Sequence, residues 1–425
     1  MKTLKIAVAV WTGLLASSLA YSQVIFSPVK IATSSPNSLI SINNAGQVVV
    51  NTGTSDSYQV SSWNRVSGAD PLDLVGTNSG GADINSSGDI VGAGDPDHSG
   101  VLQAFMWQPL IGTQWLGSLG GRLSAASGIN DSKAVVGMSY TAAYNQHAFL
   151  WTAANGMQDI TPTLTSLGGA TGVGINASNQ VVGYYYPDGA LNTLGFLWSQ
   201  AGGLQNIGDP GTLAFAISDS GMVVGQTTLA SGFRHAFSWT SSGGMTDLGV
   251  LGGAGESSAL NINGLGWIVG TSTNSANSFF HGFLWTPTSG MQDLATLAGL
   301  SVAIQVTSVQ ANDAGVIAMS TNKGGYLLVP KMTATFSSSV NPSVVGQPVT
   351  FTATLTTMLG PPPDGELVQF VASGTVLGSA PLTNGVAQLT SSAIPVGSHV
   401  VVANYPGDAN HLPAKYTALT QVVNK

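Results

Sequence analysis

Short runs of alternating apolar and polar residues recur between residues 38 and 330, and turn-forming residues separate them. A period of two is typical of β-strands, because successive side chains of a strand point to opposite faces. Between these runs, no segment of useful length places apolar residues at the spacing of a helix. The pattern therefore predicts an all-β protein built from many short strands.

One short phrase returns at intervals of 42 to 49 residues: an apolar residue, Asn, two small or polar residues and then Gly. It predicts the tight turn of a β-hairpin, because Asn can bond local backbone and Gly accepts a positive φ. Asn179 also tolerates that conformation, whereas Lys133 in the same place is the least suited. The Asn position of the seven copies is occupied by Asn43, Asn85, Asn130, Asn176, Ser218, Asn263 and Asn312.

Two further phrases complete each unit. An alternating strand that ends in Trp, such as residues 147–151, follows the turn hairpin, and a short strand such as Gly156 to Asp159 comes last. Four antiparallel strands in about 44 residues are the content of one propeller blade, so seven units predict a seven-bladed β-propeller with the first strand innermost. The last unit lacks its fourth strand, and we expect the spare strand from Val24 to Ile31 to fill that place.

From residue 332 the strands become longer, with clear alternation in Val349 to Leu355 and a turn at residues 361–365. This pattern over the last 94 residues predicts an immunoglobulin-like β-sandwich. No flexible linker separates it from the repeats, so we expect the two parts to abut. The predicted organisation is a signal peptide at 1–22, the propeller at 23–331 and the sandwich at 332–425.

The N-terminal residues predict export. Lys2 and Lys5 precede an apolar stretch from Ile6 to Leu15 and then small residues up to Ser22, as in a secretory signal peptide. The apolar stretch is too short to span a bilayer, and no other segment approaches 18 apolar residues, so no membrane span is expected. The chain has no cysteine, so it must be stable outside the cell without disulfides.

Charge restricts the expected partners. Only 7% of the residues are charged, and removal of Lys2 and Lys5 leaves 9 basic against 19 acidic residues. A surface with this balance repels polyanions, which argues against nucleic acid and anionic membranes as partners. Ser, Thr, Asn and Gln are therefore expected to cover the surface.

The phrase at residues 147–151, together with Gly156 to Asp159 and the Asn turns, resembles the bacterial extracellular HAF repeat family over residues 38–330. The resemblance implies an exported bacterial protein and carries no established activity or functional residues. Asn341 to Ser343, Gly346 to Phe351 and Tyr405 to Asp408 resemble the bacterial Ig-like repeat family. In that family such modules commonly act as spacers or adhesion units.

Histidine and aspartate each recur at one position of several units, as functional residues could. His147, His235 and His281 occupy one position and suggest a metal ring, while Asp159, Asp247 and Asp293 suggest paired carboxylates. Repetition favours structural roles for both sets, because a catalytic pair needs two different environments. No phosphate-binding loop, nucleophile elbow or zinc motif is present in the sequence. We therefore predict no catalytic residue, no metal and no cofactor.

These observations favour a secreted or cell-surface non-enzymatic protein that binds or adheres to an extracellular glycan or protein. A secreted polysaccharide hydrolase or lyase on a propeller scaffold, and a structural surface-layer component, are the alternatives. Recognition is expected in the variable loops on the face opposite the Asn turns. The candidate ligand-binding residues are the aromatic side chains of those loops: Tyr140, Tyr144, Tyr184, Tyr185, Tyr186, Phe233 and Phe279.

Overall fold

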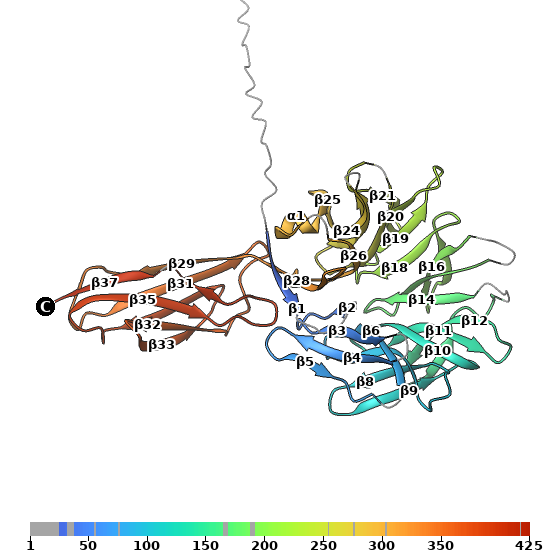
Figure 1. The fold of residues 1–425 in the computed structure, drawn as a ribbon, viewed down its shortest axis with the longest axis horizontal. Helices are drawn as coiled ribbons and strands as arrows, with labels where there is room; N and C mark the ends of the chain where they lie inside the picture. Colours follow the sequence, from blue (N-terminus) through green and yellow to red (C-terminus); the bar gives the residue numbers. More distant parts are fainter. Residues whose placement is uncertain are drawn as a thin grey trace, which may run out of the picture.

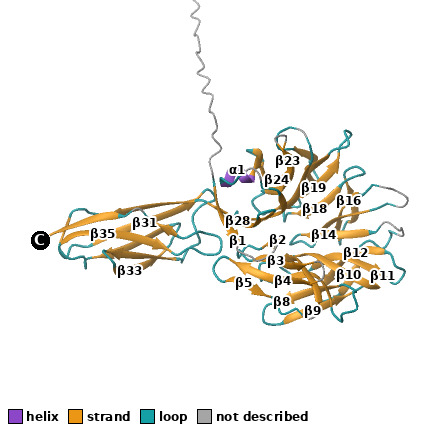
Figure 2. Cartoon of the chain, viewed as in Figure 1, coloured by secondary structure: helices purple, strands orange, loops and turns teal. Residues whose placement is uncertain are grey.

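A computed structural model shows a group of radiating β-sheets beside an elongated β-sandwich that carries the C-terminus (Figure 1). In the part of the chain that it describes, α1 (Leu294–Ala298) is the only helix (Figure 2). The expected signal peptide at 1–22 lies outside the described residues. The structure describes residues 25–31, 38–54, 57–74, 77–164, 169–187, 192–253, 255–274, 277–301, 304–416 and 418–425.

Each unit of the repeat folds into one four-stranded antiparallel sheet, and the described residues contain seven of these sheets. Within six of these sheets all four strands follow chain order from the inner strand outwards, and the sheets resemble propeller blades. The first four sheets are β2 (Ser38–Ile42), β3 (Val48–Thr54), β4 (Ser57–Asn64) and β5 (Gly68–Pro71); β6 (Thr77–Ile84), β7 (Ile90–Asp95), β8 (Gln103–Gln108) and β9 (Gly112–Gly117); β10 (Gly120–Ile129), β11 (Val135–Thr141), β12 (Gln146–Thr152) and β13 (Gly156–Asp159); and β14 (Ala170–Ile175), β15 (Val181–Tyr185), β16 (Leu194–Ser199) and β17 (Gly203–Ile207).

The seventh sheet joins the two ends of the repeat region. Its outer strand is β1, which pairs antiparallel with β28 from Phe26 opposite Pro330 to Ile31 opposite Gly325. The expected use of the N-terminal strand in the last unit is thus confirmed. The remaining sheets are β18 (Leu213–Ile217), β19 (Val223–Thr228), β20 (Arg234–Thr240) and β21 (Gly244–Gly249); β22 (Ser257–Ile262), β23 (Ile268–Asn274), β24 (Asn277–Thr286) and β25 (Gly290–Asp293); and β26 (Val306–Ala311), β27 (Ile317–Thr321), β28 (Gly324–Pro330) and β1 (Phe26–Ile31).

The core lies in layers between neighbouring sheets. Successive residues of a strand point to opposite faces, so Val181 packs against the third sheet while Val182 packs against the fifth. Each such side chain contributes about 1.5 to 3 kcal/mol when fully buried. The first and seventh sheets share a layer as well, because Leu39 and Val48 pack in one cluster with Leu327 and Val329. Every sheet therefore has a neighbour on both faces.

The inner strand of each sheet contains a β-bulge. In six sheets the extra residue is the third before the turn Asn or Ser, and in the seventh it is Thr307. Beside the bulge, the inner strand lies close to a Gly in the second strand, such as Gly225 in the run Val223 to Gly225. A Cβ on Gly225 would lie 1.9 Å from the carbonyl oxygen of Leu213. This contact explains why the second strand repeatedly carries Gly. The extra residues are Ile40, Ala82, Ser127, Val173, Phe215, Leu260 and Thr307.

The C-terminal part is a sandwich of two sheets around a core that includes Phe351, Phe370 and Tyr405. No helix in the described part of the chain is long and apolar enough to cross a membrane. One sheet holds β29 (Met332–Ser338), β31 (Val349–Thr357) and β34 (Val386–Ser391). The other holds β30 (Ser343–Val344), β37 (Leu419–Asn424), β35 (Gly397–Tyr405), β32 (Leu367–Ala372), β33 (Thr375–Pro381) and β36 (Ala414–Lys415).

The sandwich docks on the repeat region through the loop that follows β35. Arg65, in the first sheet, donates from Nη2 to the carbonyl oxygens of Asp408 and His411, the latter at 2.7 Å. Asn410 donates to the carbonyl oxygen of Asn44 at 2.9 Å, and Leu412 packs against the layer between the first and seventh sheets. The two parts therefore abut, as the missing linker predicted.

Candidate functional site

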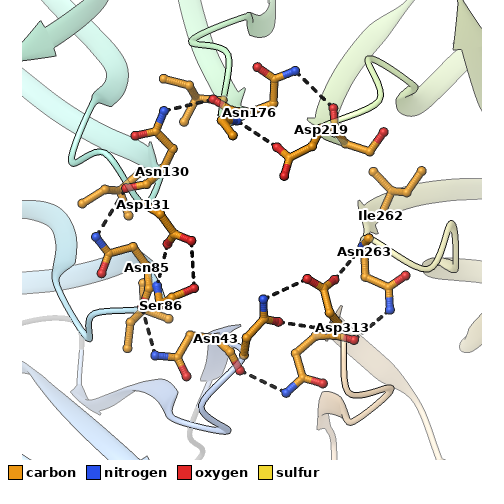
Figure 3. A pocket seen from close by; sticks show the side chains of 18 of the residues that line it. Asn43, Asn85, Ser86, Asn130, Asp131, Asn176, Asp219, Ile262, Asn263 and Asp313 are labelled. Atoms are coloured by element: carbon orange, nitrogen blue, oxygen red, sulfur yellow. Dashed lines mark hydrogen bonds between the residues drawn. The ribbon is translucent and has the colours of Figure 1, made fainter. Parts of the chain in front are cut away.

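The seven tight turns meet at one end of a central channel, where they form a polar mouth of about 220 Å³ (Figure 3). The residue after the two small positions has a positive φ in every turn, including Lys133 at 63° and Asn179 at 57°. This confirms the predicted turn conformation. In the turn of the first sheet, Asn43 Oδ1 accepts the backbone N–H of Gln47 at 2.9 Å, as an Asx residue that stabilises its own turn does.

The Asn side chains also link one turn to the next. Each Nδ2 donates to a carbonyl oxygen of the following turn, and the link fails after Ser218 because a hydroxymethyl group is too short. The six links run from Asn43 to Asn85 (2.9 Å), Asn85 to Asn130 (3.3 Å), Asn130 to Asn176 (2.9 Å), Asn176 to Ser218 (3.1 Å), Asn263 to Asn312 (2.7 Å) and Asn312 to Asn43 (3.0 Å).

The residue that directly follows the Asn or Ser of each turn forms a second set of contacts. Asp131, Asp219 and Asp313 each accept the backbone N–H of the preceding turn, at 2.8, 2.8 and 2.6 Å. The preceding turns carry the small residues Ser86, Ala177 and Gly264 at this position. In the first turn, Asn44 accepts the N–H of Asp313 at 2.9 Å and donates to its Oδ2 at 2.8 Å. These carboxylates brace the mouth of the channel, so we assign them a structural role.

A buried carboxyl group stands deeper in the channel. Asp83 accepts the Ser41 hydroxyl at 2.7 Å and the N–H of Ile129 at 3.0 Å, and burial raises its pKa. Asn261 makes the equivalent contact with the N–H of Ala311 at 3.1 Å. Because an amide serves equally well in another sheet, the Asp83 contact is a brace between inner strands.

Each repeated histidine has an aspartate partner of its own. His147 contacts Asp159 at 2.6 Å, His235 contacts Asp247 at 2.9 Å and His281 contacts Asp293 at 2.6 Å, always from the third to the fourth strand of one sheet. The same carboxylates accept backbone N–H groups, such as that of Thr161 at 2.9 Å. Among the described residues, no group of three or more His, Asp or Glu side chains is placed to hold a metal ion. The pairs join the third and fourth strands at the edge of the third, fifth and sixth sheets.

The predicted aromatic residues are distributed over four sheets and do not form one site. Tyr144 and Phe233 are well exposed, at 77% and 52%, and Tyr186 and Phe279 are exposed as well, whereas Tyr140 and Tyr184 are partly buried. Burial raises the pKa of Tyr184.

Tyr185 lies at the end of a strand and in the core, not in an exposed loop. Its strand continues to residue 185, so alternation turns the ring inwards to Phe196, with 7% exposure and the hydroxyl on Asn206 Oδ1 at 3.0 Å. Its replacement by Ala would remove core packing, so it is unsuited as a ligand-contact test.

A cavity of about 440 Å³ opens on the face opposite the Asn turns, between the fifth, sixth and seventh sheets. The bulge residues Phe215, Leu260 and Thr307 line both this cavity and the central channel. A bulge aims a side chain away from the regular pleat, and here it places large apolar groups at the inner end. The remaining lining residues are Gln226, Arg234, Glu256, Ser257, Ser258, Thr271, Phe280, Gln305 and Val306.

Four polar side chains of this lateral cavity differ from those of the mouth because they have no protein partner within the described residues. Within the described residues, the side chains of Gln226, Arg234, Glu256 and Gln305 make no hydrogen bond or ion pair. Gln146 holds the position of Arg234 in the third sheet, and there it donates to Thr171 of the next sheet at 3.0 Å. The fifth sheet therefore lacks this side-chain contact with the next sheet, and the guanidinium group of Arg234 is left without a protein partner among the described residues.

Sequence reasoning missed this cavity, although two predicted residues adjoin it in sequence. Phe233 precedes Arg234, and Phe279 precedes Phe280. The available signal was the contrast between units: Glu256 stands where other units have Leu123, Gly169 or Gly211. The fold of the repeat does not require a particular residue at positions that change from unit to unit.

The comparisons with known proteins concern the two parts separately. Residues 335–424 match a family described as bacterial Ig-like domain (group 3), which confirms the predicted C-terminal module. A search of curated proteins finds no match.

Two similar solved structures are extracellular domains from B. thetaiotaomicron whose names describe hybrid two-component systems, at 9% identity each and TM-scores of 0.43 and 0.47. They cover 94% of this chain, and the chain spans 58% and 59% of their length. A catalytically inactive virginiamycin B lyase from Staphylococcus aureus has 11% identity and a TM-score of 0.44, over 71% of this chain and 98% of its own.

Proposed function

We propose that this chain is a secreted or cell-surface binding protein without enzymatic activity, exported by its N-terminal signal peptide. The seven sheets then constitute a seven-bladed propeller of HAF repeats that presents a recognition face, and the Ig-like module spaces or docks it. The ligand is an extracellular glycan or protein.

The lateral cavity carries this proposal. It combines an apolar inner end at Phe215 and Leu260 with unpartnered polar groups at its rim, which is the composition of a ligand site. Leaving polar groups without a partner is unfavourable unless water or a ligand satisfies them. Among the described residues, the lining contains one carboxylate, Glu256, and no histidine, so these residues do not provide the carboxyl pair of most glycosidases.

The test is binding of the full chain to arrays of glycans and of peptides, compared with a variant whose lateral cavity is filled. Thr307→Phe fills it at a bulge position, and the bulge at Phe215 shows that the fold accepts this ring. Ser127→Phe is the matched control, because Ser127 is a bulge residue that lines the channel and not the lateral cavity.

We expect Thr307→Phe to lose binding and Ser127→Phe to retain it, with similar melting temperatures. Equal binding by both variants would place recognition elsewhere. Turnover on a panel of polysaccharides, or self-assembly of the purified chain into ordered layers, would support the enzymatic or the surface-layer alternative instead.

A further inference from the structure

The lateral cavity concentrates charge in a chain that has little of it. The sequence contains three arginines and two glutamates, and one of each, Arg234 and Glu256, lines this cavity. Arg234 begins β20 in the fifth sheet, while Glu256 directly precedes β22 in the sixth. The two charges therefore approach the cavity from two different sheets.

These two charges do not neutralise each other. No ion pair within 4.0 Å joins them in the described residues, although both line the same cavity. The backbone of Glu256 is fixed, because its N–H donates to Thr273 Oγ1 at 2.8 Å and its carbonyl accepts the N–H of Thr273 at 2.8 Å. The backbone of Glu256 is thus held at the edge of the cavity, and its carboxylate is left available for a ligand.

We infer that the lateral cavity binds a short peptide segment that carries both a carboxylate and an ammonium group, with an apolar side chain between them. This inference rests on the proposed function of the same cavity. The planar guanidinium of Arg234 matches a carboxylate in two parallel hydrogen bonds, and Glu256 accepts from an ammonium group.

The apolar lining suits the middle of such a ligand. Phe215 and Leu260 stand at the inner end, and Phe280 lines the cavity from the sixth sheet. Aromatic rings bind apolar side chains over a large area with little loss of conformational entropy. The amides of Gln226 and Gln305 have no protein partner and can bond the peptide backbone.

Net charge argues for a ligand with both signs. The chain has a formal net charge of −8, so a purely anionic ligand is repelled over longer distances. A purely cationic ligand would leave Arg234 without a partner and beside a like charge. A neutral oligosaccharide could bond both groups through its hydroxyls but would neutralise neither charge, whereas a ligand with both signs forms an ion pair with each.

The experiment is calorimetric titration of the full chain with tetrapeptides that have free termini and two central Phe or Leu residues. The same peptides with an acetylated N-terminus or an amidated C-terminus, and neutral cellotetraose, complete the set of probes. We expect each cap to weaken binding about tenfold or more. Arg234→Gln, which installs the residue of the third sheet, should abolish the effect of the C-terminal cap, and Glu256→Leu that of the N-terminal cap.

Arg122→Gln is the matched control, since it removes an exposed arginine of the third sheet that does not line the lateral cavity. Peptide binding that is insensitive to Arg234→Gln and Glu256→Leu would overturn the inference. Cellotetraose binding that Thr307→Phe abolishes, without peptide binding, would overturn the ligand class and leave the proposed function intact. Binding of neither probe set nor any array ligand would contradict both.

Discussion

Asn312 of the last tight turn donates from Nδ2 to Oδ1 of Asn410, in the Ig-like module, at 2.9 Å. Asn410 in turn donates to the carbonyl oxygen of Asn44 in the first turn, at 2.9 Å. One amide from the C-terminal module therefore binds both the beginning and the end of the repeat region. The module stabilises the place where the first and seventh sheets meet.

Asn410→Ala should lower the free energy of unfolding of the full chain by about 1 to 2 kcal/mol, because it removes one partly buried and one exposed hydrogen bond. Urea denaturation would measure the loss. Asn155→Ala is the control, since Asn155 is exposed and its side chain makes no hydrogen bond within the described residues. Equal midpoints for the two variants would contradict a stabilising role for the docked loop.

Gly225→Ala should be strongly destabilising, by about 2 to 3 kcal/mol or more, since the new Cβ would lie 1.9 Å from the Leu213 carbonyl oxygen. The same substitution at Gly80 is the control, because the nearest atom to a Cβ there is at 3.8 Å. Denaturation midpoints of both variants would check this. A tolerated Gly225→Ala would mean that the bulge of β18 is absent in solution.

Gly221→Val and Gly266→Val should each cost about 1 to 3 kcal/mol, because φ is 84° and 76° at these positions. Gly221→Asn should cost much less, since Asn179 occupies the same position of another turn at φ 57°. Thermal unfolding of the three variants would measure the difference. If Val and Asn proved equivalent at residue 221, backbone conformation would not be the reason for Gly.

Deletion of residues 24–31 should cause aggregation or a large fall in melting temperature. The deletion removes β1, exposes the edge of β28 and takes the buried side chains of Phe26 and Ile31 from two core layers. Light scattering and calorimetry on a chain that starts at residue 32, against one that starts at residue 23, would show this. A monomeric and equally stable deletion variant would refute the role of β1.

Two neighbouring carboxyl groups of the Ig-like module should give opposite pH dependences. Burial alone would raise the pKa of Asp408, but hydrogen bonds with His411 and Glu366 outweigh it and hold the pKa at about 2. Its stabilising contribution is therefore present above the unfolded pKa of about 3.9 and is lost as the pH falls towards 2. Burial raises the pKa of Glu366, so its ionised form disfavours the folded state near neutral pH.

Melting temperatures between pH 2 and pH 7 would test both signs. Asp408→Asn should destabilise the chain at pH 7 and have little effect at pH 2. Glu366→Gln should stabilise it at pH 7, because the amide keeps an acceptor for the Tyr405 hydroxyl without the charge. The reverse order of the two effects would contradict the assigned pKa directions.

The sequence predicted features that depend on neighbours along the chain. The Asn turns, the four strands of each unit and the placement of β1 follow from local turn chemistry and from counting strands. The end of β15 differs from the expectation that Tyr184 and Tyr185 lie in a loop, because both residues continue the alternation that begins at Val181. The burial of Tyr185 follows from that extension.

The lateral cavity could not be predicted because three units contribute to it. Phe215, Glu256 and Thr307 lie far apart in the sequence, and a one-residue bulge decides that Phe215 and Thr307 point inwards. Comparison of equivalent positions in different units was the available signal. The docking of Asn410 likewise depends on the relative position of two domains, which no local pattern encodes.

The second set of contacts at the channel mouth has a consequence for the number of units. Small and acidic residues alternate from Ser86 to Asp313, and a strictly alternating cycle needs an even number of members. Seven is odd, so seven turns cannot alternate strictly between small and acidic residues, and one turn must carry a different residue. Asn44 is that residue, which donates and accepts at once, and the Ig-like module attaches there. A set of six or eight units could alternate without such an exception, so the odd number of units accounts for the different residue at position 44.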